Sequence, residues 1–421
     1  MRKIEIDSLD FVFFIKSVIS QCFAKRNIEK FYYFCGMNVE LNISRLRYLL
    51  SLYGMKDADL LAIVNSGLKR KYSHEQVFAD QIDLKILKKI DKLLFNKGLS
   101  FYVDPSPIVA SDSMSVFFRK KTFNEELNFT SKKVVNDYES LKNYLASLDV
   151  LSDVKTEIGI PHCTQHTDPR SAAQRIREII YPKGECKKPR DFLKALIINL
   201  AEVGVLVFEY LEAPNKKEKA NIDGFFLSPN FIVLKRYSHF KREIFTLLHE
   251  LGHCVLDKEE VESLDVTSFD YSKMSSIERW CNDFAYFFLV GEYADQVSKI
   301  VVADGTNDYQ FPLFDEISSK CFISRCALFT RLLYSGRISP KDYGKVIEDL
   351  NEQYANQKAQ EMAKLAGSGG SKHHPSAPQP IYSPKFLSTL SVALHDGTVR
   401  PAELYRMKIP AKVVEGLRLW W

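Results

Sequence analysis

Residues 249–253, His-Glu-Leu-Gly-His, combine side chains that could hold a metal ion and move a proton. They lie in segment 241–257, which is predicted to form one amphipathic helix because apolar residues recur on a single face. Those residues are Ile244, Leu247, Leu248, Leu251 and Val255. On a helix, His249 and His253 are one turn apart, so both imidazoles can reach one tetrahedral zinc ion. Glu250 lies beside that face, where a carboxylate can take a proton from a metal-bound water.

A third ligand would distinguish a zinc site from a surface helix with two ordinary histidines, because a catalytic zinc takes three protein ligands and keeps one position open. The next predicted helix is segment 275–291, and its Glu278 lies 25 residues after His253. Asn282 follows one turn later on the same face, where it can hydrogen-bond a ligand. Three rival glutamates lie in the polar segment between the helices, where no packed helix orients them: Glu259, Glu260 and Glu262. The alternative for Glu278 is a solvated helix charge.

The two segments together resemble the ImmA/IrrE-type zinc metallopeptidases. In that family the helix after the HExxH helix reads roughly Glu-x-x-(Ala/Cys)-Asn-x-Phe-Ala, and this chain matches it at Glu278, Cys281, Asn282, Phe284 and Ala285. The resemblance implies that Glu278 is the third zinc ligand. It extends to segment 222–253, similar to the hairpin that leads into the family's zinc helix, and to a later helix in segment 321–339. Many relatives continue from Phe-Ala into Leu-Leu-x-Pro, whereas residues 287–290 contain no proline.

The hydrophobic pattern predicts an α+β, mainly helical protein. We expect an all-α N-terminal domain and a zincin-like peptidase domain, in which a small antiparallel sheet packs on the HExxH helix. Strands are predicted at 205–211 and, as a hairpin, at 224–228 and 231–235. The expected order is a helix-turn-helix-like domain (1–105), a connector with a helix (106–168), the peptidase domain (169–345), a charged helix with a flexible linker (346–380) and a C-terminal helical tail (381–421).

The N-terminal module resembles the helix-turn-helix module often fused ahead of these peptidases. Where a recognition helix would lie, in segment 68–81, the cations of Lys69, Arg70 and Lys71 could contact phosphates. No set of Gln, Asn or Arg side chains is clearly aimed at base edges. Two interpretations stay open: DNA contact, and a degenerate helical module that binds protein partners or packs on the peptidase.

Composition sets the broad class of the protein. A chain of 421 residues with 46% hydrophobic content can bury a sizeable core, and a net charge of +5 permits nucleic-acid contact without arguing for it. No apolar run reaches membrane-spanning length, and the first residues show no signal-peptide cleavage site. Eight cysteines without CxxC spacing indicate reduced thiols. We therefore expect a cytoplasmic protein with no membrane association.

The cysteines near histidines allow two interpretations each. Cys254 and Cys281 are predicted to be small core residues, with a thiolate switch or an extra metal ligand as the alternative. Cys163 lies between His162 and His166, which would suit a second metal site. An ordinary polar loop is favoured there because no fourth ligand is suitably spaced.

The sequence thus predicts a gluzincin-like zinc endopeptidase. His249, His253 and Glu278 would hold Zn²⁺ and leave a fourth position for water. Glu250 would be the general base that accepts the proton of that water and passes it to the leaving amine.

Further expectations concern the substrate. His239 and Tyr237 are candidate donors to the oxyanion, with structural roles as the alternative. An extended substrate is expected along the edge of strand 231–235. The resemblance implies a protein partner: a co-encoded helix-turn-helix repressor or an antitoxin-like protein, in stress response, mobile-element control or phage defence.

Two other classes of function stay open. One is a DNA-binding transcriptional regulator or toxin–antitoxin component whose zinc site is structural or regulatory. The other is a catalytically silent toxin that acts by binding. A structural zinc site usually has four protein ligands, often cysteines, so three ligands and an open position favour catalysis.

Overall fold

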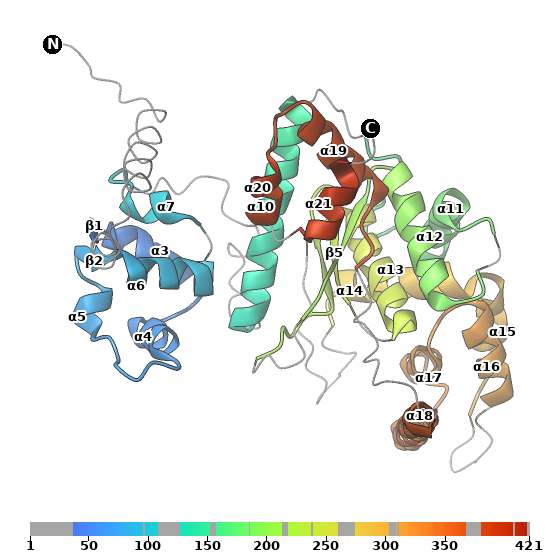
Figure 1. Ribbon diagram of the computed structural model, residues 1–421. Helices are drawn as coiled ribbons and strands as arrows, with labels where there is room; N and C mark the ends of the chain where they lie inside the picture. Colours follow the sequence, from blue (N-terminus) through green and yellow to red (C-terminus); the bar gives the residue numbers. More distant parts are fainter. Residues whose placement is uncertain are drawn as a thin grey trace. The chain divides into compact units, whose positions relative to one another are not determined.

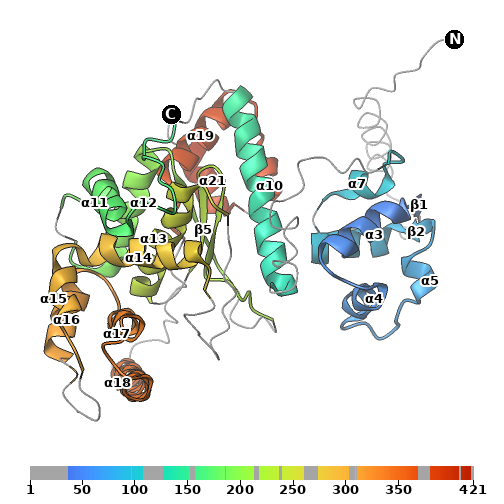
Figure 2. The same ribbon diagram turned by 180° about the vertical axis from the view of Figure 1, so that it is seen from behind.

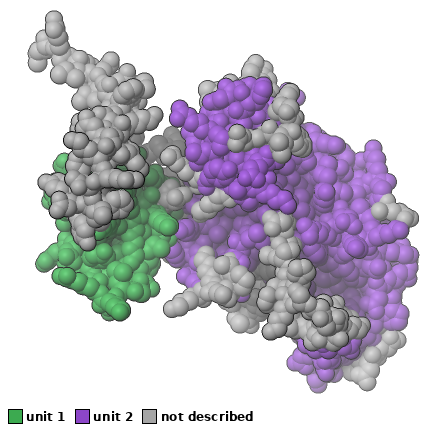
Figure 3. Space-filling model, in the orientation of Figure 1, with its two compact units in different colours: residues 1–114 green, residues 115–421 purple. Residues whose placement is uncertain are grey.

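The chain divides into two compact units, residues 1–114 and 115–421 (Figure 3). The computed structural model describes residues 37–95, 97–107, 127–151, 157–184, 186–212, 218–236, 239–259, 274–302, 309, 311–367, 380–406 and 409–418. Four predictions lie outside these residues: the lack of a signal peptide at the N-terminus, the donor role of Tyr237, the rival ligands Glu260 and Glu262, and most of the flexible linker.

The first unit is mainly helical. Its elements are β1 (Asn38–Glu40), α3 (Ile43–Leu52), α4 (Asp57–Asn65), α5 (His74–Val77), β2 (Gln81–Asp83), α6 (Leu84–Ile90), the π-helix η2 (Asp91–Phe95) and α7 (Leu99–Val103) (Figure 1). Strands β1 and β2 pair antiparallel, so the prediction of an all-α domain was wrong. Three-residue strands are too short to show an alternating pattern in the sequence. Where a recognition helix was expected, α5 has four residues.

The second unit carries the residues of chemical interest. Its elements are α10 (Phe129–Leu151), α11 (Pro169–Ile180), α12 (Pro189–Glu202), β3 (Leu206–Tyr210), β4 (Gly224–Leu227), β5 (Phe231–Lys235), α13 (Phe240–Leu256), α14 (Ser276–Val290), the 3-10 helix η4 (Gly291–Tyr293), α15 (Ala294–Ser298), α16 (Phe311–Lys320), α17 (Arg325–Tyr334), α18 (Pro340–Gly367), α19 (Pro384–His395), α20 (Pro401–Arg406) and α21 (Ala411–Arg418). The predicted α+β, mainly helical class is confirmed. None of the described helices combines the length and the apolar character needed to cross a membrane.

The three-stranded sheet has the order β3-β5-β4. The predicted hairpin of β4 and β5 is antiparallel, with Phe225 opposite Val233. Strand β3 runs parallel to β5, with Phe208 also opposite Val233, so the prediction of a purely antiparallel sheet was wrong. All five residues of β3 are buried, and a strand buried on both faces gives no sequence signal of its direction. Because β5 is paired on both sides, its edge cannot receive a substrate strand as expected.

Helices cover both faces of this sheet (Figures 1 and 2). Val207 and Ile232 point into the core shared with α12 and α13. Phe208 and Phe231 point into a second core, formed with α10 and the C-terminal helices α19 to α21. Successive side chains of a strand point to opposite faces of the sheet, so each strand contributes residues to both cores. The connector helix and the tail are therefore structural layers of the unit that contains α13.

Removing the ring of Phe386 should destabilise this second core. Phe386 is 2% exposed and packs edge-on against Phe208, with 4.9 Å between ring centroids. We expect Phe386→Ala to lower the free energy of unfolding by about 3–5 kcal/mol, because the change leaves a cavity. Urea unfolding followed by tryptophan fluorescence reports on this unit alone, since all three tryptophans lie after residue 114. Tyr405→Ala, at a 46% exposed position, is the control; an equal loss there would contradict the assignment.

A buried charge cluster lies where α13 begins. The Arg236 guanidinium contacts the Glu243 carboxyl group at 2.5 Å and lies 3.7 Å from Glu209, and all three side chains are almost fully buried. The backbone N–H of Ile381, at the start of the tail, donates to Glu209 at 2.5 Å. Burial and the neighbouring Glu209 carboxylate raise the pKa of Glu243 to about 9. The cluster therefore joins β3, α13 and the tail through buried polar contacts.

This raised pKa predicts a pH dependence of stability. The folded protein keeps the Glu243 proton that the unfolded chain loses above a pKa of about 4.3. The resulting stabilisation is complete below that value and declines as the pH rises towards about 9. Glu243→Gln keeps a hydrogen-bond donor and cannot ionise, so its unfolding free energy should decline less steeply over this range. Parallel slopes for the two proteins in pH-resolved urea unfolding would refute the raised pKa of Glu243.

Candidate metal centre

Helix α13 presents one face to the sheet and holds the HELGH residues in its last two turns. Every residue from Leu247 to Leu256 is buried. The helix ends at Asp257, whose left-handed backbone (φ 48°, ψ 49°) turns the chain back on itself. Left-handed residues commonly end helices in this way. Consequently His249 and His253 are fixed in a buried, regular helix while the chain after it folds back beside His253.

Helix α14 supplies the third side chain and packs closely against α13. Its N-cap Ser275 accepts a hydrogen bond from the backbone N–H of Glu278 at 3.0 Å, which fixes the first turn. Gly252 faces Cys281, and a Cβ atom at Gly252 would lie only 3.1 Å from the Cα of Cys281. The glycine of the HELGH segment thus permits the close approach that brings Glu278 beside the two histidines.

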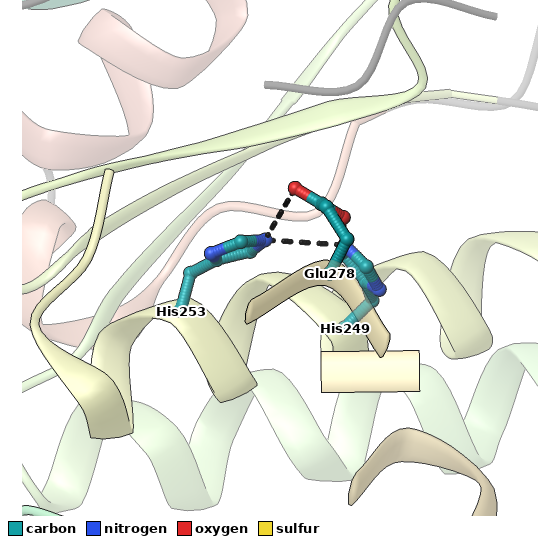
Figure 4. A group of neighbouring side chains, drawn as sticks. All are labelled: His249, His253 and Glu278. Atoms are coloured by element: carbon teal, nitrogen blue, oxygen red, sulfur yellow. Dashed lines mark hydrogen bonds and ion pairs between the residues drawn. The ribbon is translucent and has the colours of Figure 1, made fainter. Parts of the chain in front are cut away.

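The three side chains converge on one point (Figure 4). The Nε2 atoms of His249 and His253 are 3.2 Å apart. The Glu278 carboxylate lies 3.0 Å from His249 Nε2 and 3.3 Å from His253 Nε2. Ligands about 2.0–2.1 Å from a tetrahedral zinc ion are separated from each other by about 3.3 Å. Glu278 makes these contacts with its two carboxylate oxygens, Oε2 towards His249 and Oε1 towards His253, and all three separations are close to the spacing of ligands around one zinc ion.

Each histidine has an oxygen atom next to its other ring nitrogen. His253 Nδ1 lies 3.0 Å from the backbone carbonyl of Lys258, which can only accept a hydrogen bond. His249 Nδ1 lies 3.0 Å from Asn282 Oδ1, whose amide nitrogen faces the sulfur of Met274. Protonation of both Nδ1 atoms leaves a lone pair on each Nε2 atom. This is the tautomer in which histidine binds a metal through Nε2.

The charge of the cluster also suits a cation. Burial alone would raise the pKa of Glu278, but positive charge on the facing imidazoles of His249 and His253 holds that pKa well below its usual range, so the carboxyl group ionises when it faces a cation. Glu278 is therefore a carboxylate. Two imidazole lone pairs and a carboxylate repel one another unless a cation lies among them, and two nitrogens with one oxygen are a donor set that zinc accepts. The three residues fit a metal ion.

Glu250 lies on the sheet side of α13. It is buried, and its Cγ atom would be 3.2 Å from a Cβ atom built at Gly224 of β4. The same Cβ would lie 2.7 Å from Cγ2 of Thr246. Only a glycine at this point of β4 leaves room for the Glu250 side chain.

The other candidates lie elsewhere. His239 precedes α13 by one residue, about 15 Å along the axis from His249, and its ring contacts Tyr354. This position gives no support to a donor role for His239, which stays a prediction. Glu259 accepts a hydrogen bond from the backbone N–H of Ser228 at 2.7 Å and is no rival ligand. In the described parts of the chain, one group of three or more His, Cys, Asp or Glu residues could hold a metal, and it does not include Cys163.

The cysteines beside the cluster are core residues in the structure. Cys254 and Cys281 are at most 1% exposed, and burial raises the pKa of Cys254 to about 12. A thiol with such a pKa is a poor thiolate switch. No disulfide joins the six cysteines that the structure describes: Cys163, Cys186, Cys254, Cys281, Cys321 and Cys326.

Two functional features were missed from the sequence. The carbonyl of Lys258 next to His253 is a backbone group, so no side-chain pattern marks it. The need for Gly224 follows from β4 packing against α13, which is a long-range contact. A glycine at the start of a predicted strand was the available signal, because glycine in a strand often marks close backbone approach.

Two packed helices that present two histidines and a glutamate carry the donor set found in zinc peptidases. Residues 201–293, which include β3 to η4, match the family Peptidase_M78, the IrrE N-terminal-like domain. The predicted resemblance to ImmA/IrrE-type peptidases is confirmed for this segment. The helix-turn-helix module lies outside the match and stays a prediction. Neither a curated protein nor a solved structure matches the chain.

Proposed function

We propose that the protein is a gluzincin-like zinc endopeptidase in which His249, His253 and Glu278 hold the metal. The observation that carries this proposal is the convergence of two imidazole nitrogens and a carboxylate, whose facing atoms are 3.0–3.3 Å apart. Three protein ligands are typical of catalytic zinc, whereas structural zinc usually has four. The match of residues 201–293 to a peptidase family supports the same conclusion.

Different groups around the proposed metal site have different roles in peptide hydrolysis. When bound, zinc supplies Lewis-acid chemistry: it lowers the pKa of a water molecule and polarises a carbonyl group. Glu250 accepts the proton of the attacking water and donates it to the leaving amine. Asn282 and the Lys258 carbonyl hold the two imidazoles in the tautomer that exposes Nε2.

The packing of Glu250 against β4 gives a test of its position. Gly224→Ala places a Cβ atom 2.7 Å from Thr246 Cγ2 and 3.2 Å from Glu250 Cγ, so these side chains must shift. We expect cleavage to fall by about 10–100-fold with zinc affinity unchanged, because small displacements of a catalytic group are costly. Adding Thr246→Ser removes the closest clash and should restore part of the activity. Wild-type activity in Gly224→Ala would show that Glu250 is not positioned by this contact.

The substrate we propose is a co-encoded helix-turn-helix repressor or an antitoxin-like protein, in stress response, mobile-element control or phage defence. The family match supports a peptidase, and the resemblance of the sequence points to this class of target. Co-expression with the product of the neighbouring gene, followed by mass mapping, tests it. A discrete cut with the wild-type chain and none with Glu250→Gln would support the proposal; an intact partner in both would refute it. We further propose that the protein acts in the cytoplasm, which agrees with the free thiols of the six cysteines in the described residues.

A DNA-binding regulator is the second candidate function. Its support is the exposed, basic run of Lys69, Arg70 and Lys71 between α4 and α5. An electrophoretic shift with the protein's own promoter region discriminates the two functions. Specific binding that persists in salt, without cleavage of the co-encoded partner, would favour the regulator. Replacing the three cations with alanine should then abolish the shift.

A further inference from the structure

The chain just after α13 folds back so that the backbone carbonyl of Lys258 contacts His253, the second histidine of the proposed metal site. The Lys258 N–H donates to the carbonyl of His253 at 3.0 Å, and the Lys258 carbonyl lies 3.0 Å from His253 Nδ1. Asp257, the residue between helix and loop, has the left-handed backbone that makes this return possible. The orientation of the His253 ring thus depends on a loop at a helix end, a place where chains commonly fray.

Side chains on both sides of Lys258 tie that loop to the hairpin turn between β4 and β5. The hydroxyl of Ser228 donates to Asp257 Oδ1 at 2.7 Å, and the backbone N–H of Ser228 donates to Glu259 Oε1 at 2.7 Å. Ser228 is itself held from α10, because Lys142 Nζ donates to its carbonyl at 2.7 Å. Glu259 is only 8% exposed, and a carboxylate is buried at a cost unless it is hydrogen-bonded. Asp257 and Glu259, on either side of Lys258, are therefore both held by Ser228.

We propose that Ser228, Asp257 and Glu259 form a clamp that positions His253 for metal binding. The clamp fixes the Lys258 carbonyl, which accepts the Nδ1 proton of His253 and directs the Nε2 lone pair towards the cluster. Partners of this kind orient metal-bound histidines, and their loss typically reduces metal affinity by about 10–100-fold. The inference rests on the proposed metal site and names three residues outside the HELGH segment that set its affinity.

Matched substitutions separate the clamp from general stability. Asp257→Gly tolerates the left-handed backbone and removes the acceptor for Ser228, whereas Asp257→Asn tolerates that backbone and keeps an acceptor. Glu259→Ala removes the acceptor for the Ser228 N–H, whereas Glu259→Gln keeps one. Zinc dissociation constants are measured by chelator competition on the full chain. We expect a rise of about 10–100-fold for Asp257→Gly and Glu259→Ala, and of less than about threefold for the two matched variants.

Two further measurements exclude a merely structural effect. In the metal-free protein, ¹⁵N NMR of the His253 ring should show one Nδ1-protonated tautomer in the wild type and a mixture in Asp257→Gly. Ser228→Ala and Asp257→Gly remove the same hydrogen bond, so their effects on zinc affinity should not add. Unchanged zinc affinity in Asp257→Gly, equal losses in Asp257→Gly and Asp257→Asn, or additive effects would each overturn the clamp. A wild type that binds zinc but cleaves no peptide would instead refute the proposed function and leave the clamp standing.

Discussion

Replacing Glu250 with glutamine is expected to reduce peptide cleavage by about 10²–10⁴-fold while zinc stays bound. The reason is that an amide occupies the same space beside Gly224 but cannot accept the proton of the attacking water. None of the three proposed ligands changes. Cleavage of the substrate found by co-expression gives the rate, and elemental analysis of the purified protein gives the zinc content.

The control for this substitution is Glu202→Gln, an exposed glutamate at the end of α12. It removes the same charge from the same unit and should leave both rate and zinc content unchanged. Full activity in Glu250→Gln would show that another group is the base. Loss of zinc together with activity would show that Glu250 acts on the metal and not on the proton.

Glu278→Gln should have the opposite pattern, with metal lost first and activity lost in consequence. The substitution removes the only anion among the three proposed ligands while keeping the size of the side chain. Removing a direct ligand should exceed the 10–100-fold effect of an indirect partner, so we expect zinc affinity to fall by more than about 100-fold. Chelator competition measures this constant without any peptide substrate.

Glu292→Gln, at an exposed position just after α14, is the matched control and should bind zinc as the wild type does. Cleavage by Glu278→Gln should recover in part at high zinc concentration, because the defect is one of occupancy. Wild-type zinc affinity in Glu278→Gln would contradict the assignment of the third ligand. The two glutamates thus have distinguishable roles: Glu250→Gln should lower the cleavage rate with zinc bound, and Glu278→Gln should lower zinc affinity.

The helical parts of the site could be predicted because their signals are local. The spacing of His249 and His253 fixes their relation on any helix, whereas the role of Glu278 as third ligand was implied by the resemblance to ImmA/IrrE-type peptidases. Asn282 follows from the same period, since it lies one turn beyond Glu278. The close packing of α13 and α14 at Gly252, which brings Glu278 to the histidines, was not predicted.

Features that depend on contacts between distant segments could not be predicted. Strand β3 pairs in parallel with β5, but all of its residues are buried, so its sequence does not indicate whether the pairing is parallel or antiparallel. The packing of Phe386 from the tail against Phe208 joins residues far apart in the chain, and no local pattern records it. His239 is close to α13 in sequence, but it lies at the N-terminal end of that helix, far along the axis from His249, because a helix rises by about 1.5 Å per residue.

The most direct test of the metal centre is X-ray absorption at the zinc edge on the purified full chain. We predict about one zinc per chain, bound by nitrogen and oxygen alone at about 2.0–2.2 Å, with an imidazole signature from two histidines. In Glu278→Gln prepared in the same way, the bound zinc should be largely lost. A chain that binds no zinc, or a zinc–sulfur distance of about 2.3 Å from Cys254 or Cys281, would contradict the site described by His249, His253 and Glu278.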